Sequence, residues 1–337
     1  MRVLLRPAVF ESSDRLGLYV LLWLGGVLRH RVIPDPLVHP AHSMWVASLD
    51  PGTARLWEEM VDSCLNEETL RPAHWEIAID SVAHAVWAQP TPVLPIADAI
   101  DLLLQPYRIV LENNVNDRAF LMAIAGAEER QMLALAEKRA SLVFEMGGGT
   151  TIVPRIAEIR RTESLRRLAS VMVDSDALRP PTQGETHQSV EGVLARDARR
   201  EAADEFTGVH LQVLRRRAIE NYLTIPSLRR WARGDDDLRA TVDVFEALSP
   251  SQQYHYNMKN GFAGDQRRLA ETQDRTEVNR IRALYQNLTP TQRQALNSGF
   301  GHDVGKLFGW AVRSEDAEIE AREEVRSFLN AVLTRMR

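Results

Sequence analysis

The chain has 337 residues, of which 45% are hydrophobic and 26% are charged, and its formal net charge is −5. These totals describe a globular protein long enough for two or more domains, and they exclude a disordered chain. A nucleic-acid partner would need a local basic patch, because the overall charge repels phosphate. The single cysteine, Cys64, excludes an internal disulfide and a cysteine-rich zinc site, so we expect a cytoplasmic protein.

The first region, residues 1–104, is predicted to be mixed and mainly helical. Residues 16–28 form an uncharged run of 13 residues. A bilayer span needs about 20, so we interpret this run as a buried helix or strand–turn and expect no membrane partner. The spacing of apolar residues predicts further helices at 53–64, 75–87 and 96–104.

The second region, residues 105–225, alternates short apolar runs with helical segments. Tyr107 begins the first such run, and the predicted strands are 107–111, 142–146, 171–173 and 209–213. This alternation is typical of a mostly parallel sheet with crossover helices, so the predicted fold class is α/β. The second strand ends in the glycine turn 147–149, and Thr150 or Thr151 is expected to cap a helix that runs to about residue 168.

The third region, residues 226–337, is predicted to be helical. Turns are expected near Asp235, Ser249 and Thr289, and a last amphipathic helix is expected from Ser314 to the end of the chain. A further helix is predicted at residues 190–205, before the fourth strand. The whole chain therefore consists of an α-rich N-terminal region, an α/β region and a helical C-terminal region.

Acidic side chains follow two of the predicted strands. Glu112 comes directly after the first strand, and Asp174 and Asp176 follow the third. In open α/β sheets, ligands bind at the carboxyl ends of the strands. Carboxylates this close repel one another unless a cation lies between them, and hard oxygen ligands suit Mg²⁺ or Mn²⁺. The alternative is that Asp174 and Asp176 form a solvated turn that caps the next segment.

Four segments together suggest a family. They are IVLENNVND around Glu112, FEMGGGT, VMVDSDA around Asp174 and Asp176, and LRRRAIENYL, which contains Glu220. In this order and spacing they resemble the TOPRIM domain of OLD-family nucleases and of stand-alone TOPRIM nucleases in bacterial defence systems. The LRRRAIENYL segment is the most specific of the four. The resemblance covers roughly residues 105–225, about a third of the chain.

The resemblance implies metal-dependent cleavage of phosphodiester bonds. It makes Glu112, Asp174 and Asp176 the expected primary metal ligands, with Glu220 as a further ligand and Asp117 as a second-site ligand. Two metal ions held by carboxylates can activate water and stabilise the leaving oxygen.

The chain departs from the family pattern in two places, and the family's lysine has no certain match. Asn113 stands where a glycine usually follows the first glutamate, and Asp117 lies five positions after that glutamate instead of four. Lys259, in YHYNMKNGF, is the best match for the lysine that steadies the scissile phosphate. Lys306, in GHDVGKLF, is the alternative.

The expected function is a metal-dependent nuclease that acts on DNA or RNA as an anti-phage defence effector. Because the chain has no ATPase motif, an ATPase or sensor would be a separate protein. The alternative is a catalytically silent TOPRIM-like scaffold that binds a regulatory partner. The sequence leaves the oligomeric state open. Two arginine-rich stretches are candidate nucleic-acid surfaces, with solvated helix faces as the alternative: Arg215, Arg216, Arg217, Arg229 and Arg230, and Arg160, Arg161, Arg166 and Arg167.

Overall fold

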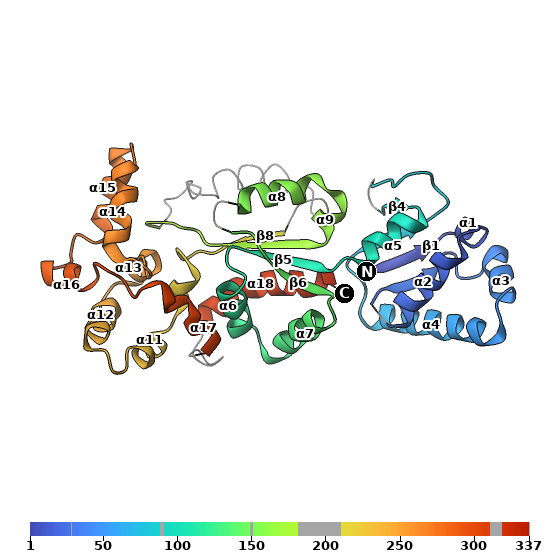
Figure 1. Cartoon of the computed structure of the whole chain (residues 1–337), viewed down its shortest axis with the longest axis horizontal. Helices are drawn as coiled ribbons and strands as arrows, with labels where there is room; N and C mark the ends of the chain where they lie inside the picture. The colour runs from blue at the N-terminus through green and yellow to red at the C-terminus, as the bar shows by residue number, and fades with distance from the viewer. Residues whose placement is uncertain (28, 88–90, 149–150, 181–209, 311–318, 337) are drawn as a thin grey trace. The chain divides into compact units, whose positions relative to one another are not determined.

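A computed structural model describes residues 1–27, 29–87, 91–148, 151–180, 210–310 and 319–336. The chain divides into two compact units. The N-terminal unit comprises residues 1–107, 163–168 and 330–337, and the C-terminal unit comprises residues 108–162 and 169–329. The helices after residue 226 thus belong, up to residue 329, to the same unit as the second sheet (Figure 1).

The N-terminal unit contains a parallel sheet with the strand order β2-β1-β3-β4. Helix α2 packs against α4 and α5, and α2 and α4 both contact strand β2. The elements are β1 (Arg2–Leu5), α1 (Pro7–Phe10), α2 (Arg15–Gly26), β2 (Arg31–Pro34), α3 (Pro40–Ala47), α4 (Pro51–Leu70), β3 (Glu76–Ile79), β4 (Val93–Leu94) and α5 (Ile96–Leu104).

Most of this region is helical, as predicted, but its four strands were not predicted. The helix predicted at residues 75–87 is wrong, because this segment contains strand β3 followed by a loop. Residues 16–26 of the uncharged run lie in helix α2, which buries Leu18, Leu21 and Leu24 against the rest of the unit. The predicted helices at 53–64 and 96–104 are confirmed as parts of α4 and as α5.

The second sheet is also parallel, with the strand order β6-β5-β7-β8. This confirms the predicted α/β class and the four predicted strands. The elements of this segment are β5 (Tyr107–Leu111), α6 (Asn116–Ile124), α7 (Ala127–Lys138), β6 (Leu142–Met146), α8 (Ile152–Arg161), α9 (Glu163–Arg167), β7 (Ala169–Val173), β8 (His210–Val213) and the 3₁₀ helix η1 (Ile219–Tyr222).

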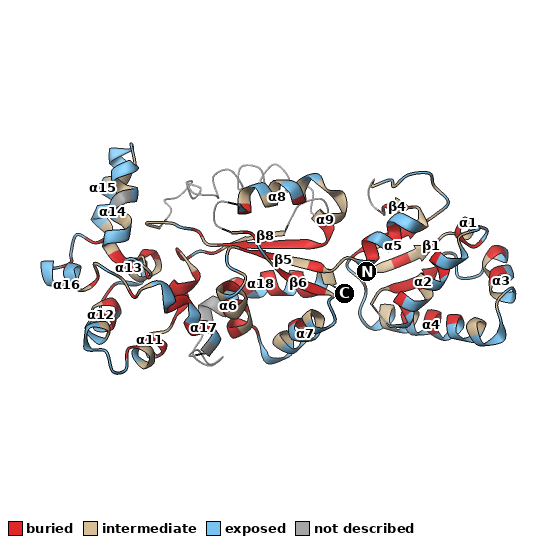
Figure 2. Ribbon diagram, in the orientation of Figure 1, coloured by how far each residue is buried: buried red, intermediate tan, exposed pale blue. Residues whose placement is uncertain are grey.

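Strands β5 and β7 are central and apolar because helices cover both faces of the sheet. Ile109, Val110, Val171 and their neighbours are buried, as Figure 2 shows along both strands. The connection from β5 to β6 and the connection from β6 to β7 run in opposite directions across the sheet. Because such crossovers are right-handed, the helices of the two connections lie on opposite faces of the sheet. Helices α6 and α7 therefore cover one face, and α8 covers the other (Figure 1). Buried strands of this kind read as continuous apolar runs, which is why they were recognisable in the sequence.

The helix predicted to follow the glycine turn is two helices, α8 and α9, separated at Thr162. Thr151 occupies the N-cap position of α8, but its hydroxyl donates to the carbonyl oxygen of Gly147 instead of capping the helix. Thr150 lies outside the described residues, and so does the helix predicted at 190–205.

The remainder of the chain is helical, as predicted. Helices α11 to α16 lie beyond the carboxyl ends of the second sheet's strands (Figure 1). Residue Ser314 is outside the described part of the chain, where the last helix begins at Ile319. The elements are α11 (Ile225–Trp231), α12 (Asp236–Glu246), α13 (Pro250–His255), α14 (Gly261–Glu271), α15 (Arg275–Leu284), α16 (Pro290–Ala295), the 3₁₀ helix η2 (His302–Lys306), α17 (Leu307–Trp310) and α18 (Ile319–Met336).

Candidate functional site

The carboxyl ends of β5 and β7 bring Glu112 and Asp174 together. These strands pair in parallel with Leu111 opposite Met172, so each carboxylate follows its strand at the same edge of the sheet. The backbone amide of Asp174 donates to Oε1 of Glu112 at 3.0 Å. On its other side, the carbonyl oxygen of Glu112 accepts a hydrogen bond from the amide of Gly148. Glu112 is therefore fixed between the ends of two neighbouring strands, as its position in the sequence predicted.

Asp117 lies buried in the first turn of α6, close to Glu112. Its Oδ2 accepts a hydrogen bond from the amide of Asn113 at 2.9 Å, and Oδ1 of Asn113 accepts from the amides of Val115 and Asn116. Among the described non-glycine residues, only Ala140 and Asp176 have positive φ. Asn113 thus forms this turn through side-chain hydrogen bonds and without the left-handed backbone that a glycine would allow.

The loop after β7 holds Asp176 in a left-handed conformation, with φ of 53°. Its amide donates to the carbonyl oxygen of Arg217 at 2.8 Å, and its own carbonyl oxygen accepts from Nη1 of Arg268 at 3.1 Å. The buried hydroxyl of Ser175 donates to the carbonyl oxygen of Arg216 at 2.8 Å. Asp174 and Asp176 therefore lie on a loop at the sheet edge, where three separate hydrogen bonds constrain a sparsely populated backbone conformation.

Glu220 and Lys259 complete the group. Glu220 lies in η1 with only 1% of its side chain exposed, and its Oε1 is 3.0 Å from Nζ of Lys259. Oε2 of Glu220 is buried and has no hydrogen-bond partner among the described residues. We call Glu112, Asp117, Asp174, Asp176 and Glu220 the acidic cluster.

Of the two candidate lysines, Lys259 is the one that lies at the acidic cluster. Nζ of Lys306 pairs with Oδ1 of Asp303 at 2.6 Å, three residues away on the surface. That contact is an exposed pair within η2, and exposed pairs of this kind contribute little to stability.

Burial and mutual repulsion disfavour negative charge on the cluster. Burial is the largest cause that raises the pKa of Glu112, and together with the charges of Asp176 and Asp117, and against the hydrogen bond from Asp174, it brings this pKa to about 7. Burial and, less strongly, repulsion from Glu220 raise the pKa of Asp117 to about 6. The pKa of Asp174 is raised well above its usual range by burial and then by Glu220 and Glu112.

The same negative field raises the pKa of Lys259 and so favours its charged form. Burial lowers the pKa of Lys259, but attraction to Glu220 and Asp174 outweighs burial and raises it above the ordinary value. Lys259 is therefore a cation that faces several carboxylates. Its single positive charge does not balance the negative charge that these carboxylates carry when ionised.

The chemistry of the cluster fits a hard divalent cation. It offers carboxylate oxygens alone, a surplus of negative charge and one buried oxygen of Glu220 without a hydrogen-bond partner. The described residues contain no group of three or more His, Cys, Asp or Glu side chains already placed to hold one ion. The donor set thus fits Mg²⁺ or Mn²⁺, while the side chains are not arranged as a closed coordination shell.

Gly305 is a further residue of this site that the sequence did not reveal. A Cβ atom at this position would lie 2.6 Å from Oε1 of Glu220 and 3.1 Å from Nδ2 of Asn116. Glycine therefore allows η2 to pack closely against η1 and α6. The contact joins residues far apart in the chain, so no local pattern could have predicted it.

The first arginine-rich stretch is mostly structural, contrary to the basic patch we considered. Arg216 is buried between the rings of Tyr222 and Tyr254, at 4.6 and 4.0 Å from the ring centroids. Arg217 is buried and forms two hydrogen bonds with Asp265, at 2.6 and 2.7 Å. Arg229 is exposed and pairs with Asp243 and Glu246. Arg215 stays exposed at the surface.

The second stretch is similar. In the N-terminal unit, Arg167 is buried over the rings of Trp75 and Trp87, and Arg166 pairs with Glu163. Arg161, at the end of α8 in the C-terminal unit, is exposed. Neither stretch forms a continuous basic surface from the arginines proposed for it.

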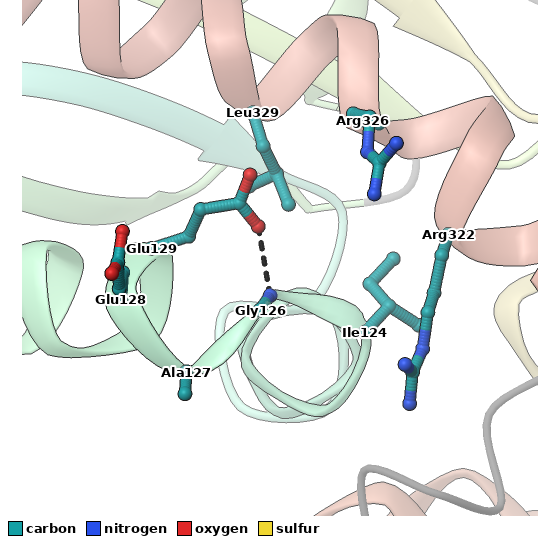
Figure 3. Close-up of a pocket in the computed structure, with 8 residues that line it drawn as sticks. All are labelled: Ile124, Gly126, Ala127, Glu128, Glu129, Arg322, Arg326 and Leu329. Carbon is teal, nitrogen blue, oxygen red and sulfur yellow. Dashed lines mark hydrogen bonds between the residues drawn. The ribbon is translucent and has the colours of Figure 1, made fainter.

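A cavity of about 320 Å³ lies elsewhere in the C-terminal unit, between the α6–α7 junction and α18 (Figure 3). Its lining includes Arg322 and Arg326 of α18 and Glu128 and Glu129 of α7, and Oε2 of Glu129 accepts a hydrogen bond from the amide of Gly126 at 2.7 Å. No member of the acidic cluster lines this cavity. It is therefore distinct from the candidate site.

Comparisons with protein-family models, with curated proteins and with solved structures found no match to this chain. Among the described helices, none combines the length and the apolar character that crossing a membrane requires.

Proposed function

We propose that this chain is a divalent-metal-dependent nuclease of the TOPRIM type, which hydrolyses phosphodiester bonds of DNA or RNA. The observation that carries the proposal is the acidic cluster itself. The four segments that resemble the family meet at one edge of a parallel sheet, and Lys259 arrives there from the helical region. Parallel sheets bind ligands at this edge.

Within this proposal, Glu112, Asp174 and Asp176 hold the ion, and Asp117 and Glu220 extend the ligand set to a second position. A bound divalent ion would supply activation of water and neutralisation of the phosphate charge. The chain's own residues supply the rest. Asp174 is oriented by the amide of Ile219, which donates to its Oδ1 at 3.1 Å.

Phosphate binding falls to Lys259. Lys259 is partly exposed, with 37% of its side chain accessible, and so it can contact a phosphate while it faces the cluster.

The same proposal extends to the compartment, the biological role and the partners of the protein. We place the nuclease in the cytoplasm as an anti-phage defence effector. The single cysteine is buried and unpaired, which suits a reducing compartment. An ATPase or sensor would be a separate protein.

A second candidate function is a catalytically silent TOPRIM-like scaffold that binds a regulatory partner. One observation favours it: the acidic side chains of the described residues do not form a ready set of three around one point. A scaffold keeps the fold and its buried carboxylates without turnover.

The test is a cleavage assay on plasmid DNA and on total tRNA, with Mg²⁺, with Mn²⁺ and with a chelator. The variant is Asp174→Asn, which keeps the side-chain volume, and Asp303→Asn on the surface of η2 is the control. We expect metal-dependent cutting that Asp174→Asn abolishes and Asp303→Asn retains. If the wild-type chain neither cuts nor binds Mn²⁺ in a calorimetric titration, the scaffold is the better description.

A further inference from the structure

Two arginines form hydrogen bonds with the backbone of Asp176, and their guanidinium groups are used differently. The carbonyl oxygen of Arg217 accepts from the amide of Asp176, while its buried guanidinium pairs with Asp265. Arg268, on α14, is exposed, and its Nη1 donates to the carbonyl oxygen of Asp176 at 3.1 Å. Among the described residues this is the one hydrogen bond of Arg268, and no carboxylate lies within 4.0 Å of its guanidinium. An exposed positive charge therefore lies next to the acidic cluster without a counter-ion in the described part of the chain.

The guanidinium of Arg268 has unused capacity to bind an anion. It carries five N–H donors, and the bond to Asp176 uses one of them. The planar arrangement of the remaining donors matches two oxygens of a phosphate. The bond to Asp176 also restricts a long side chain, so less conformational entropy is lost when a ligand binds. Arg268 is thus a partly ordered phosphate donor beside the cluster.

Arg268 and Lys259 are held at different points of the acidic cluster. Nζ of Lys259 contacts Glu220, whereas Nη1 of Arg268 contacts Asp176. Helix α14 begins at Gly261, just after Lys259, and at 1.5 Å per residue it carries Arg268 about 10 Å along its axis. Successive phosphates of one nucleic-acid strand are about 3.4 Å apart along the axis. The two cations are therefore separated as contacts to two phosphates of one strand require.

We propose that Arg268 binds a phosphate of the substrate strand beside the one that is cut, so that the substrate is a polynucleotide and not a single phosphodiester. This inference rests on the nuclease function proposed above and adds the substrate class. Arg268 holds the substrate and takes no part in breaking the bond. Because phosphate contacts carry no base information, it adds affinity for every sequence alike.

The first test is binding of a labelled single-stranded oligonucleotide, measured by fluorescence anisotropy at several salt concentrations with Ca²⁺ in place of Mg²⁺. We expect Arg268→Gln to weaken binding about tenfold, as for one hydrogen-bonded charge. The slope of log K against log salt should fall by about 0.7, the change for one phosphate contact. Arg268→Lys keeps the charge and should keep the slope. The matched control is Arg293→Gln on α16, because Arg293 is also exposed and also donates to a backbone carbonyl, that of Tyr285.

The second test varies substrate length in a cleavage assay. From a dinucleotide with one phosphate to a tetranucleotide with three, kcat/KM of the wild type should rise. In Arg268→Gln this gain should be about tenfold smaller, through KM and not kcat, while the affinity for Mn²⁺ stays within about twofold of the wild type.

Three outcomes overturn the proposal. If Arg268→Gln loses Mn²⁺ affinity and kcat on both substrates alike, Arg268 acts only by holding the loop of Asp176. If Arg268→Gln binds the oligonucleotide with the affinity and the salt slope of the wild type, the inference fails and the nuclease proposal stands. If the wild type neither binds nor cuts an oligonucleotide, both fail together.

Discussion

Nζ of Lys259 lies 3.0 Å from Oε1 of Glu220, and this pair joins the helical part of the C-terminal unit to the edge of its sheet. Glu220 is almost fully buried, whereas Lys259 is partly exposed. The lysine is thus the chain's own counter-ion for a carboxylate that has little access to water.

Removing this counter-ion should destabilise the protein unless a divalent ion replaces it. We expect Lys259→Gln to lower the free energy of unfolding by about 1–3 kcal/mol, less than for a fully buried pair because Lys259 is partly in water. Added Mn²⁺ should raise the melting temperature of the variant more than that of the wild type. Lys306→Gln is the control and should change stability by less than about 0.5 kcal/mol. Equal melting temperatures for both variants would contradict this role.

The raised carboxyl pKa values predict how stability depends on pH without metal. Burial raises the pKa of Glu112 from 4.5 to about 7 and that of Asp117 from 3.8 to about 6. The folded chain therefore holds these protons after the unfolded chain has released them. Their contribution to stability is present below about pH 4 and is lost as pH rises through the folded pKa values.

Thermal unfolding in a chelator checks this pH dependence. Because other groups also titrate, the informative quantity is the difference between the wild type and Glu112→Gln. Between about pH 5 and pH 8 the wild type should lose more stability than Glu112→Gln, and added Mn²⁺ should remove the difference. Parallel pH curves for the two proteins would show that the carboxyl of Glu112 titrates as it does in the unfolded chain.

Gly305 provides a prediction about the shape of the site. In Gly305→Ala the new methyl group would overlap Oε1 of Glu220, so this carboxylate must move. We expect cleavage and Mn²⁺ affinity to fall at least about tenfold, which corresponds to about 1.4 kcal/mol. Gly309→Ala in α17 is the matched control, because a Cβ there meets the nearest atom, Cβ of Ala119, at 4.0 Å. If Gly305→Ala binds Mn²⁺ with the affinity of the wild type, Glu220 takes no part in metal binding.

Arg217 should act in folding and not in nucleic-acid binding. Arg217→Gln leaves the carboxylate of Asp265 without its buried partner, and breaking such a pair costs about 3–5 kcal/mol. Arg215→Gln, at an exposed position beside it, should cost less than about 0.5 kcal/mol. Denaturant unfolding measures both. The assignment fails if Arg217→Gln is as stable as the wild type and the salt dependence of nucleic-acid binding becomes shallower.

The sequence predicted the strands of the second sheet because they alternate with helical segments; β5, β6 and β7 are largely apolar runs, and β8 is the exception, with His210 and Gln212 among its four residues. The strands of the first sheet were missed for a physical reason. β1, β2 and β3 have four residues each, and β4 has two. Runs this short are no different from fragments of a buried helix, and their pairing partners lie far along the chain.

The candidate site, like the fold, was predictable only in part. The strand ends placed Glu112 and Asp174 at one edge, and the structure brings them into hydrogen-bond contact. The roles of neighbouring charges were not predictable. Arg217 looked like part of a basic patch because its partner, Asp265, is 48 residues away. A local sequence pattern shows where charged residues are, but only the fold shows which of them are paired with an opposite charge.

The assembly of the acidic cluster has a consequence for how the chain is made. The ribosome delivers Glu112 and Asp174 first and adds Lys259 and Gly305 much later. If synthesis stops after Asp174 and before Lys259, the chain carries the carboxylates of Glu112 and Asp174 without the ammonium that offsets their repulsion. Such a chain also lacks the segment around Gly305 that packs against Glu220. The complete site therefore forms only after the chain has been made as far as Gly305, and chains released before that point lack it.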